Sequence, residues 1–296
     1  MVAVVSQSPG QARTVLRRPA LPGRHLSLIG RIALFVLLAM ILAAILGPLL
    51  WRQGPLQQHV ADRLEGPSWA HPFGTDNFGR DILARLFMGA RWSLTGAAIV
   101  CLGTSVLGFA LATVAALGNR VLDTVIGRLT EALLALPGIV PALALTAVLG
   151  PSFPNLLFAL IVTSWPSSAR VYRALILRER EAQYVEGAFA LGASRTRIVV
   201  RHILPNILGP VAVLATANFG GVILSLASLS FLGLGMQPPT PEWGRMVNEA
   251  RPYFQRLPWQ MVIPGLCIAI TVLSVNLTGD ALRDTVARET PVRGGR

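Results

Sequence analysis

Lysine is absent from this chain of 296 residues, so all 26 of its basic residues are arginine. A Walker A loop uses a lysine to hold the β- and γ-phosphates of a nucleotide. The chain therefore carries no standard P-loop. If it takes part in ATP-driven work, another subunit has to bind the nucleotide.

Charged residues are scarce, at 14% of the chain against about 25% in soluble domains. Hydrophobic residues reach 53% and the mean hydropathy is +0.57, which places the chain in a membrane. The formal net charge of +12 could suggest a nucleic-acid binder, yet the positive cytoplasmic loops of membrane proteins explain the same excess. We therefore expect membrane lipid, and no nucleic acid, as a partner.

Residues that carry chemistry are few as well. The two cysteines, Cys101 and Cys267, lie inside apolar runs without metal-ligand spacing. All four histidines lie outside the apolar runs, while Glu131 and Asp280 lie at the ends of such runs. Ion-coupled transporters usually carry ionisable residues within the membrane. The sequence therefore predicts neither catalysis nor a metal site, and it argues against an ion-driven pump.

Long apolar runs predict six transmembrane helices, because each span needs about 20 mostly apolar residues. A turn at residues 151–155 divides the longest run in two. The expected spans cover residues 32–50, 92–118, the two parts of 132–177 on either side of that turn, 207–235 and 258–279. A five-span arrangement, with the fourth run re-entrant, is the alternative.

The distribution of arginine orients these spans. With both termini inside, 18 of the 26 basic residues lie on the cytoplasmic side, seven of them between Arg170 and Arg201. An excess of basic residues marks the cytoplasmic face. We therefore expect a multi-pass protein with both termini in the cytoplasm. The first run is longer than the apolar part of a secretory signal, which favours a retained helix.

The organisation follows from the spans. We expect a cytoplasmic tail (1–27), a first transmembrane helix with an extracytoplasmic loop (28–91), a core of five transmembrane helices (92–282) with a charged loop at 178–206, and a second tail (283–296). In the extracytoplasmic loop, apolar residues at 82–87 share one face of a short helix that Asp76 or Asp81 can cap.

The fifth span carries modest polarity at Asn218, Ser225 and Ser228. These side chains either form hydrogen bonds between helices or line a polar pathway. The sequence leaves both interpretations open. Pro137 and Pro141 predict a bent third span, and such bends often border a cavity.

The segment at 184–206 is a charged, helix-forming patch between two apolar runs. Gly192 is free to adopt a positive φ, Ser194 can cap a second short helix, and Pro205 is expected to end or kink that helix. The segment is then either a docking knob made of two short helices or an amphipathic loop whose arginines meet anionic lipid.

This segment resembles the EAA motif of ABC-importer permeases, which has the pattern E-A-A-x3-G-x9-I-x-L-P. Gly187 replaces the first alanine, and His202 stands in the place of the isoleucine. The positions that match in register are Glu186, Ala188, Gly192, Leu204 and Pro205.

Two further stretches, 71–91 and 229–246, resemble the dipeptide, oligopeptide and nickel branch of that family, so the resemblance covers residues 28–285. The chain is similar to the second, C-type permease subunit. The resemblance implies an all-α membrane protein with six transmembrane helices, a type I ABC importer permease (MetI-like) fold and a cytoplasmic coupling helix.

The resemblance also implies the function. The chain would form half of a pathway for peptides in the bacterial cytoplasmic membrane, beside a second permease subunit. An extracytoplasmic solute-binding protein would deliver the peptide, and two ATPase domains would bind ATP and Mg²⁺. The residues expected to contact the ATPase are Glu186, Gly187, Ala188, Leu191 and Gly192, with Leu204 and Pro205 completing the motif. Import of nickel or another small solute, and a self-sufficient secondary transporter, are the alternatives.

Overall fold

The computed structural model describes residues 27–289, and within them the chain is helical apart from loops and one isolated β-bridge between Thr75 and Asp81. The all-α expectation is confirmed. The helices are α1 Leu28–Leu50, α2 Ile82–Leu117, α3 Arg120–Leu134, α4 Ile139–Leu149, α5 Phe153–Arg180, α6 Gln183–Ala190, α7 Arg195–Ile198, α8 Leu204–Phe231, α9 Trp243–Ala250 and α10 Trp259–Glu289. Shorter segments are 3₁₀ turns at Val60–Asp62 and Arg251–Tyr253 and a π-helical segment at Val199–Ile203.

Four helical segments are long and apolar enough to cross a membrane: α1, α2, α10 and Val199–Phe231, which contains α8. Counting α3 and α4 together gives a fifth span, although the two helices meet at 93°. The expected count of six is therefore not confirmed, and the differences lie in the third and fourth spans.

The third expected span is broken between α3 and α4. Pro137 lies in the break, and a proline disfavours a helical conformation at the residue before it. Residues 118–131, which lie between the second and third expected spans, are mostly helical. Asn119 caps α3, its side chain accepting a hydrogen bond from Leu122 N at 2.9 Å. A bend was expected here, and the structure makes it a near right angle.

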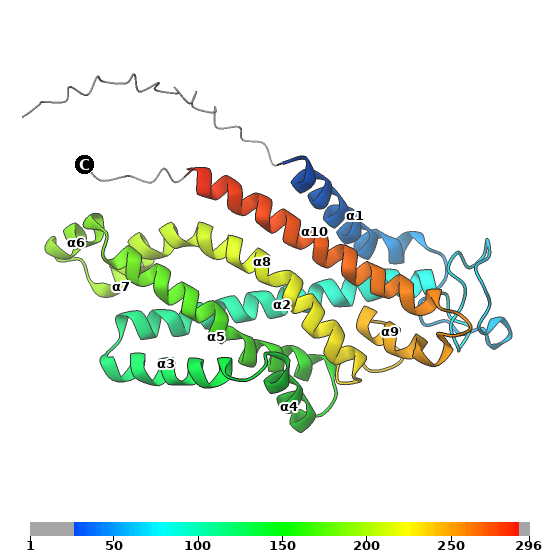
Figure 1. Ribbon diagram of the computed structural model, residues 1–296. Coiled ribbons are helices and arrows are strands. Elements are labelled where there is room, and N and C mark those ends of the chain that lie inside the picture. The colour runs from blue at the N-terminus through cyan, green and yellow to red at the C-terminus, as the bar shows by residue number, and fades with distance from the viewer. Residues whose placement is uncertain (1–26, 290–296) are drawn as a thin grey trace, which may run out of the picture.

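The helix α5 packs along α2 inside the bundle (Figure 1). Its 28 residues extend about 42 Å at 1.5 Å per residue, which is enough to cross a bilayer. Small residues let the two helices approach closely: a Cβ atom on Gly108 of α2 would lie 3.2 Å from Ala169 N of α5. Because much of α5 is buried in protein, it tolerates more polar residues than a lipid-facing helix.

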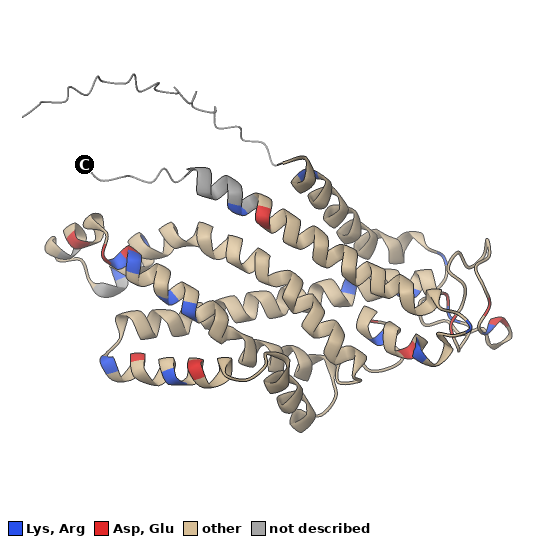
Figure 2. Ribbon diagram, viewed as in Figure 1, with Lys and Arg blue, Asp and Glu red and all other residues tan. Residues whose placement is uncertain are grey.

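Charged residues gather toward the two ends of the bundle (Figure 2). One end carries α6, α7, the start of α1 and the C-terminal end of α10, and the other carries α9 and the loop at 51–81 (Figure 1). The four spanning segments between these ends leave most of their apolar residues outside the protein core. Such an apolar belt between two charged ends is typical of a multi-pass membrane protein.

The end that carries α9 is held by buried ion pairs. The expected short helix at 82–87 is the first part of α2, and Asp81 caps it as predicted by accepting a hydrogen bond from Leu83 N at 3.1 Å. Arg80 and Arg85, both almost fully buried, share Asp76 and Glu249 as partners, with Nε–Oδ2 2.6 Å for Arg80–Asp76 and Nη2–Oε2 2.7 Å for Arg85–Glu249. The network ties the loop at 51–81 and α2 to α9.

Candidate functional site

The segment at 183–203 forms a helical knob that projects from one end of the bundle (Figure 1). Its two short helices, α6 and α7, are joined at Gly192, which has φ +81°. Ser194 caps α7, its hydroxyl accepting a hydrogen bond from Arg197 N at 3.3 Å. The expected glycine turn and serine cap are both confirmed.

Pro205 was expected to end or kink the helix, and it does not end it, because the chain stays helical from Arg195 to Phe231. The segment before the proline is π-helical, and Leu204 N donates to the Val199 carbonyl. Pro205 follows directly after this segment, as the second residue of α8. The second arm of the knob therefore runs directly into a membrane-spanning helix.

The inner face of the knob is anchored in the bundle. Val185 of α6 and Ile198 of α7 are buried, at 0% and 2% exposure. They belong to one apolar cluster that also contains Ile126 of α3 and Tyr172 of α5. Because this cluster joins residues of α6 and α7 to residues of α2, α3, α5 and α8, the knob is a packed part of the protein rather than a loose loop.

A hydrogen-bonded bracket holds the base of the knob. The Tyr184 hydroxyl donates to the Glu179 carboxylate, and Asn206 Nδ2 donates to the Tyr184 hydroxyl oxygen at 2.8 Å and to the His202 carbonyl at 2.9 Å. Partial burial, together with the neighbouring Glu179, raises the pKa of Tyr184. The bracket joins the end of α5 to α6 and to the start of α8.

The outer face of the knob carries the residues matched to the EAA pattern. Glu186, Gly187 and Gly192 are exposed, and the Leu191 side chain at the tip is 90% exposed. Ala188, which was expected to contact the ATPase, differs: it is half-buried and packs against the apolar cluster on the inner side of the knob. Farther along the chain, Leu204 is half-buried and Pro205 is exposed.

The three polar residues predicted for the pathway lie along α8. Asn218 and Ser228 are exposed, and Ser225 is half-buried. The Ser225 hydroxyl donates to the Gly221 carbonyl of its own helix at 2.9 Å, so it does not need a partner on another helix. Lining of a pathway by these residues stays a prediction.

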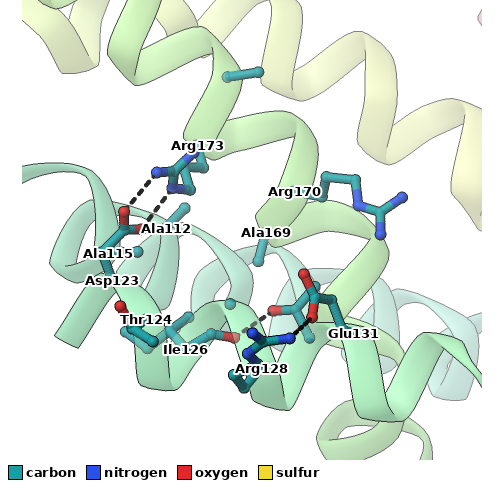
Figure 3. A pocket seen from close by; sticks show the side chains of 13 residues that line it. Ala112, Ala115, Asp123, Thr124, Ile126, Arg128, Glu131, Ala169, Arg170 and Arg173 are labelled. Atoms are coloured by element: carbon teal, nitrogen blue, oxygen red, sulfur yellow. Dashed lines mark hydrogen bonds and ion pairs between the residues drawn. The ribbon is translucent and has the colours of Figure 1, made fainter. Parts of the chain in front are cut away.

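A groove between α3 and α5 was missed by the sequence reasoning (Figure 3). Its volume is about 520 Å³, and residues of α2, α3 and α5 line it. The sequence did contain a signal, since Arg120, Asp123, Arg128 and Glu131 follow one another at helical spacings on an amphipathic α3. In the sequence, the arginines of this stretch served only to orient the spans, and Glu131 only marked the end of an apolar run.

Charges of both signs line the groove. The Arg173 guanidinium donates to the Asp123 carboxylate through two hydrogen bonds of 2.9 and 2.8 Å, and Arg128 pairs with Glu131 at 3.1 Å. Arg170 also lines the groove, and it has no ion-pair partner among the residues that the structure describes. Figure 3 shows the Asp123–Arg173 pair at one end, with Glu131 and Arg170 at the other.

The sequence is similar to those of known transport permeases. The chain is 41% identical over 255 residues to the dipeptide transport system permease protein DppC of Alkalihalophilus pseudofirmus, covering 86% of this chain and 84% of that one. It is 42% identical over 226 residues to the glutathione transport system permease protein GsiD of Pectobacterium atrosepticum, covering 76% and 75% of the two chains.

The fold is also similar to that of a solved transporter. The chain superposes on the inward-facing MetNI methionine ABC transporter with a TM-score of 0.57 at 19% identity, over 69% of this chain and 95% of that one. Residues 104–290 match the family described as binding-protein-dependent transport system inner membrane component. The protein belongs to this family and is a permease subunit of an ABC importer.

Proposed function

We propose that the chain forms half of a transmembrane pathway for short peptides, beside a second permease subunit. Two ATPase domains, which bind ATP and Mg²⁺ on the cytoplasmic side, drive the pathway, and an extracytoplasmic binding protein delivers the cargo. Relatives named as dipeptide and glutathione permeases support a peptide cargo over nickel.

In this proposal the knob lies in the cytoplasm. Arginines cluster at the knob end of the bundle, as the positive-inside rule requires of a cytoplasmic face (Figure 2). The described chain begins and ends toward the same side as the knob (Figure 1). Both termini are therefore assigned to the cytoplasm.

The observation that carries the proposal is the knob itself. Its inner face is buried by Val185 and Ile198, while its outer face presents Leu191 and Gly192 to solvent. A single exposed leucine is ordinary on a protein surface, but this one lies at the tip of an anchored protrusion. We assign ATPase contact to the exposed residues Glu186, Gly187, Leu191 and Gly192. Ala188 would support that contact from within, because it packs α6 onto the bundle, and Leu204 and Pro205 would position the second arm of the knob.

The test uses the transporter assembled from both permeases, the ATPase subunits and the binding protein. Leu191→Asp and Gly192→Asp should lose peptide uptake while the protein stays in the membrane. Leu191 is too exposed for its replacement to unfold the chain. Val121→Asp is the matched control, because Val121 is 68% exposed at the start of α3 and lies outside the knob. Wild-type uptake by both knob variants would overturn the coupling assignment.

The cargo is tested separately, on the unmodified transporter in proteoliposomes. Labelled dialanine should accumulate only when ATP and the binding protein are supplied. Uptake of ⁶³Ni²⁺ without uptake of any labelled di- or tripeptide would overturn the peptide assignment and leave the permease architecture standing.

A further inference from the structure

One arginine in the groove between α3 and α5, Arg170, has no acidic partner among the residues that the structure describes. Glu131 and Arg170 line the same end of the groove, yet no ion pair joins them within residues 27–289. We propose that this end of the groove is a binding subsite for the charged termini of a short peptide, in the cytoplasmic half of the pathway. The inference rests on the proposed peptide-import function and names a site within it.

The shape of the groove suits a small ligand. Ala112, Ala115 and Ala169 contribute short side chains to its lining, and Gly127 contributes none. A Cβ atom added at Gly127 would have no neighbour within 4 Å, so the space beside α3 is open. At about 520 Å³, the volume lies within the roughly 300–1,000 Å³ of typical ligand pockets.

The carboxylates at the two ends of the groove differ in how readily they can bind a ligand ammonium. Arg173 donates from Nε and Nη2 to the two carboxylate oxygens of Asp123. Both oxygens therefore already accept a charge-assisted hydrogen bond, which makes Asp123 a poor partner for a ligand ammonium. Glu131 pairs only with Arg128, and the side chains of that pair are 64% and 79% exposed. An exposed pair of this kind is worth about 1 kcal/mol or less, so a ligand ammonium can compete for Glu131.

Arg170 supplies the complementary group. A guanidinium binds a carboxylate through a planar fork, and Arg170 has no acidic partner in the described part of the chain. A short peptide carries an ammonium at one end and a carboxylate at the other, which matches Glu131 and Arg170 on facing helices. The subsite should bind weakly, because a transport pathway has to release what it binds.

The experiment measures thiol protection in the assembled transporter, with both native cysteines replaced by alanine. Gly127→Cys places a thiol in the open part of the groove, and Gly138→Cys places one outside it, in equally open space. At a dialanine concentration of about ten times its Kd, one-site binding slows modification of the Gly127→Cys thiol roughly tenfold. The Gly138→Cys thiol should react at an unchanged rate.

Two comparisons make the result specific to charge. N-acetylalaninamide, which has neither terminal charge, should not protect the Gly127→Cys thiol. Adding Arg170→Gln should remove the protection by dialanine, whereas Arg178→Gln, an exposed arginine on the same helix that does not line the groove, should keep it. Equal rates with and without dialanine, or equal protection by the uncharged analogue, would overturn the subsite.

Failure of the subsite differs from failure of the proposed function. Uptake of labelled dialanine is measured on the same proteoliposomes. Import of dialanine without protection of the Gly127→Cys thiol overturns the subsite alone, whereas no import of any peptide by the unmodified transporter overturns the proposed function.

Discussion

Single glycines have opposite roles within the knob. Gly192 has φ +81°, a conformation that costs other residues about 1 kcal/mol or more. Gly187 lies inside α6 with nothing within 4 Å of an added Cβ atom, so an alanine would fit there without strain. The departure from the family pattern at Gly187 therefore weakens a helix by about 1 kcal/mol, and burial of Val185 next to it keeps that helix in place.

The pH dependence of stability is a prediction at the same scale, at Asp81. Burial raises the pKa of Asp81 above its ordinary 3.8, more than hydrogen bonds from Trp51 and the Ala84 and Leu83 backbone lower it. The folded carboxyl therefore holds its proton more tightly than the unfolded one. Its contribution to stability is full below pH 3.8 and falls as pH rises from 3.8 through the raised pKa.

Asp81→Asn removes this titration and keeps an oxygen that can cap α2. The Tm of the wild type minus that of the variant should fall as pH increases above 3.8, measured by thermal unfolding in detergent at several pH values. A difference in Tm that rises over this range, or stays flat, would contradict the assigned direction of the pKa shift.

At the scale of elements, α2 and α9 are joined by charge as well as by apolar packing. Arg80 and Arg85 have side chains that are 2% exposed, and both reach the Glu249 carboxylate on α9. Two buried guanidinium groups need such acceptors, because an unpaired buried charge is costly. The N-terminal end of α2 and the helix α9 should therefore move as one rigid body.

Glu249→Gln leaves both guanidinium groups with Asp76 as their shared acidic partner. We expect this change to lower the free energy of unfolding by about 3 kcal/mol. Arg128→Gln, which removes an exposed pair on α3, should cost less than about 1 kcal/mol. The free energy of unfolding of the two variants is compared by denaturant titration in detergent. An equal loss in both variants would show that burial does not make the ion pairs of Glu249 more stabilising than an exposed pair.

At the scale of the whole molecule, one apolar cluster joins the knob to the walls of the groove. Ile126 of α3, Tyr172 of α5 and Ile198 of α7 belong to it, and each is buried. Packed interiors transmit displacement because they have few voids. A movement of the knob should therefore change the separation of α3 and α5, which links the proposed ATPase contact to the proposed peptide subsite.

The orientation of the molecule gives a direct prediction. Gly66 and Gly187 lie at opposite ends of the bundle, and both leave open space for a new side chain. In intact cells, a membrane-impermeant thiol reagent should label Gly66→Cys at once and Gly187→Cys only after the membrane is opened. The reverse pattern would place the knob outside and end the coupling proposal.

Much of the knob was predictable because its determinants are local. The positive φ of Gly192 and the cap at Ser194 each depend on residues a few positions apart, and so does the cap at Asp81 at the other end of the bundle. That the helix continues through Pro205 was not predictable from the proline alone, because Ile203 in the π-helical segment before it packs in the same apolar cluster as Tyr172 of α5.

The sequence by itself determined that this is a multi-pass helical membrane protein without its own P-loop, because long apolar runs partition into lipid and the chain has no lysine. Only the tertiary structure decided that the third span breaks near Pro137 and that α3 and α5 enclose a charged groove. Those features depend on which faces of distant helices meet. No pattern within a single segment specifies such pairing.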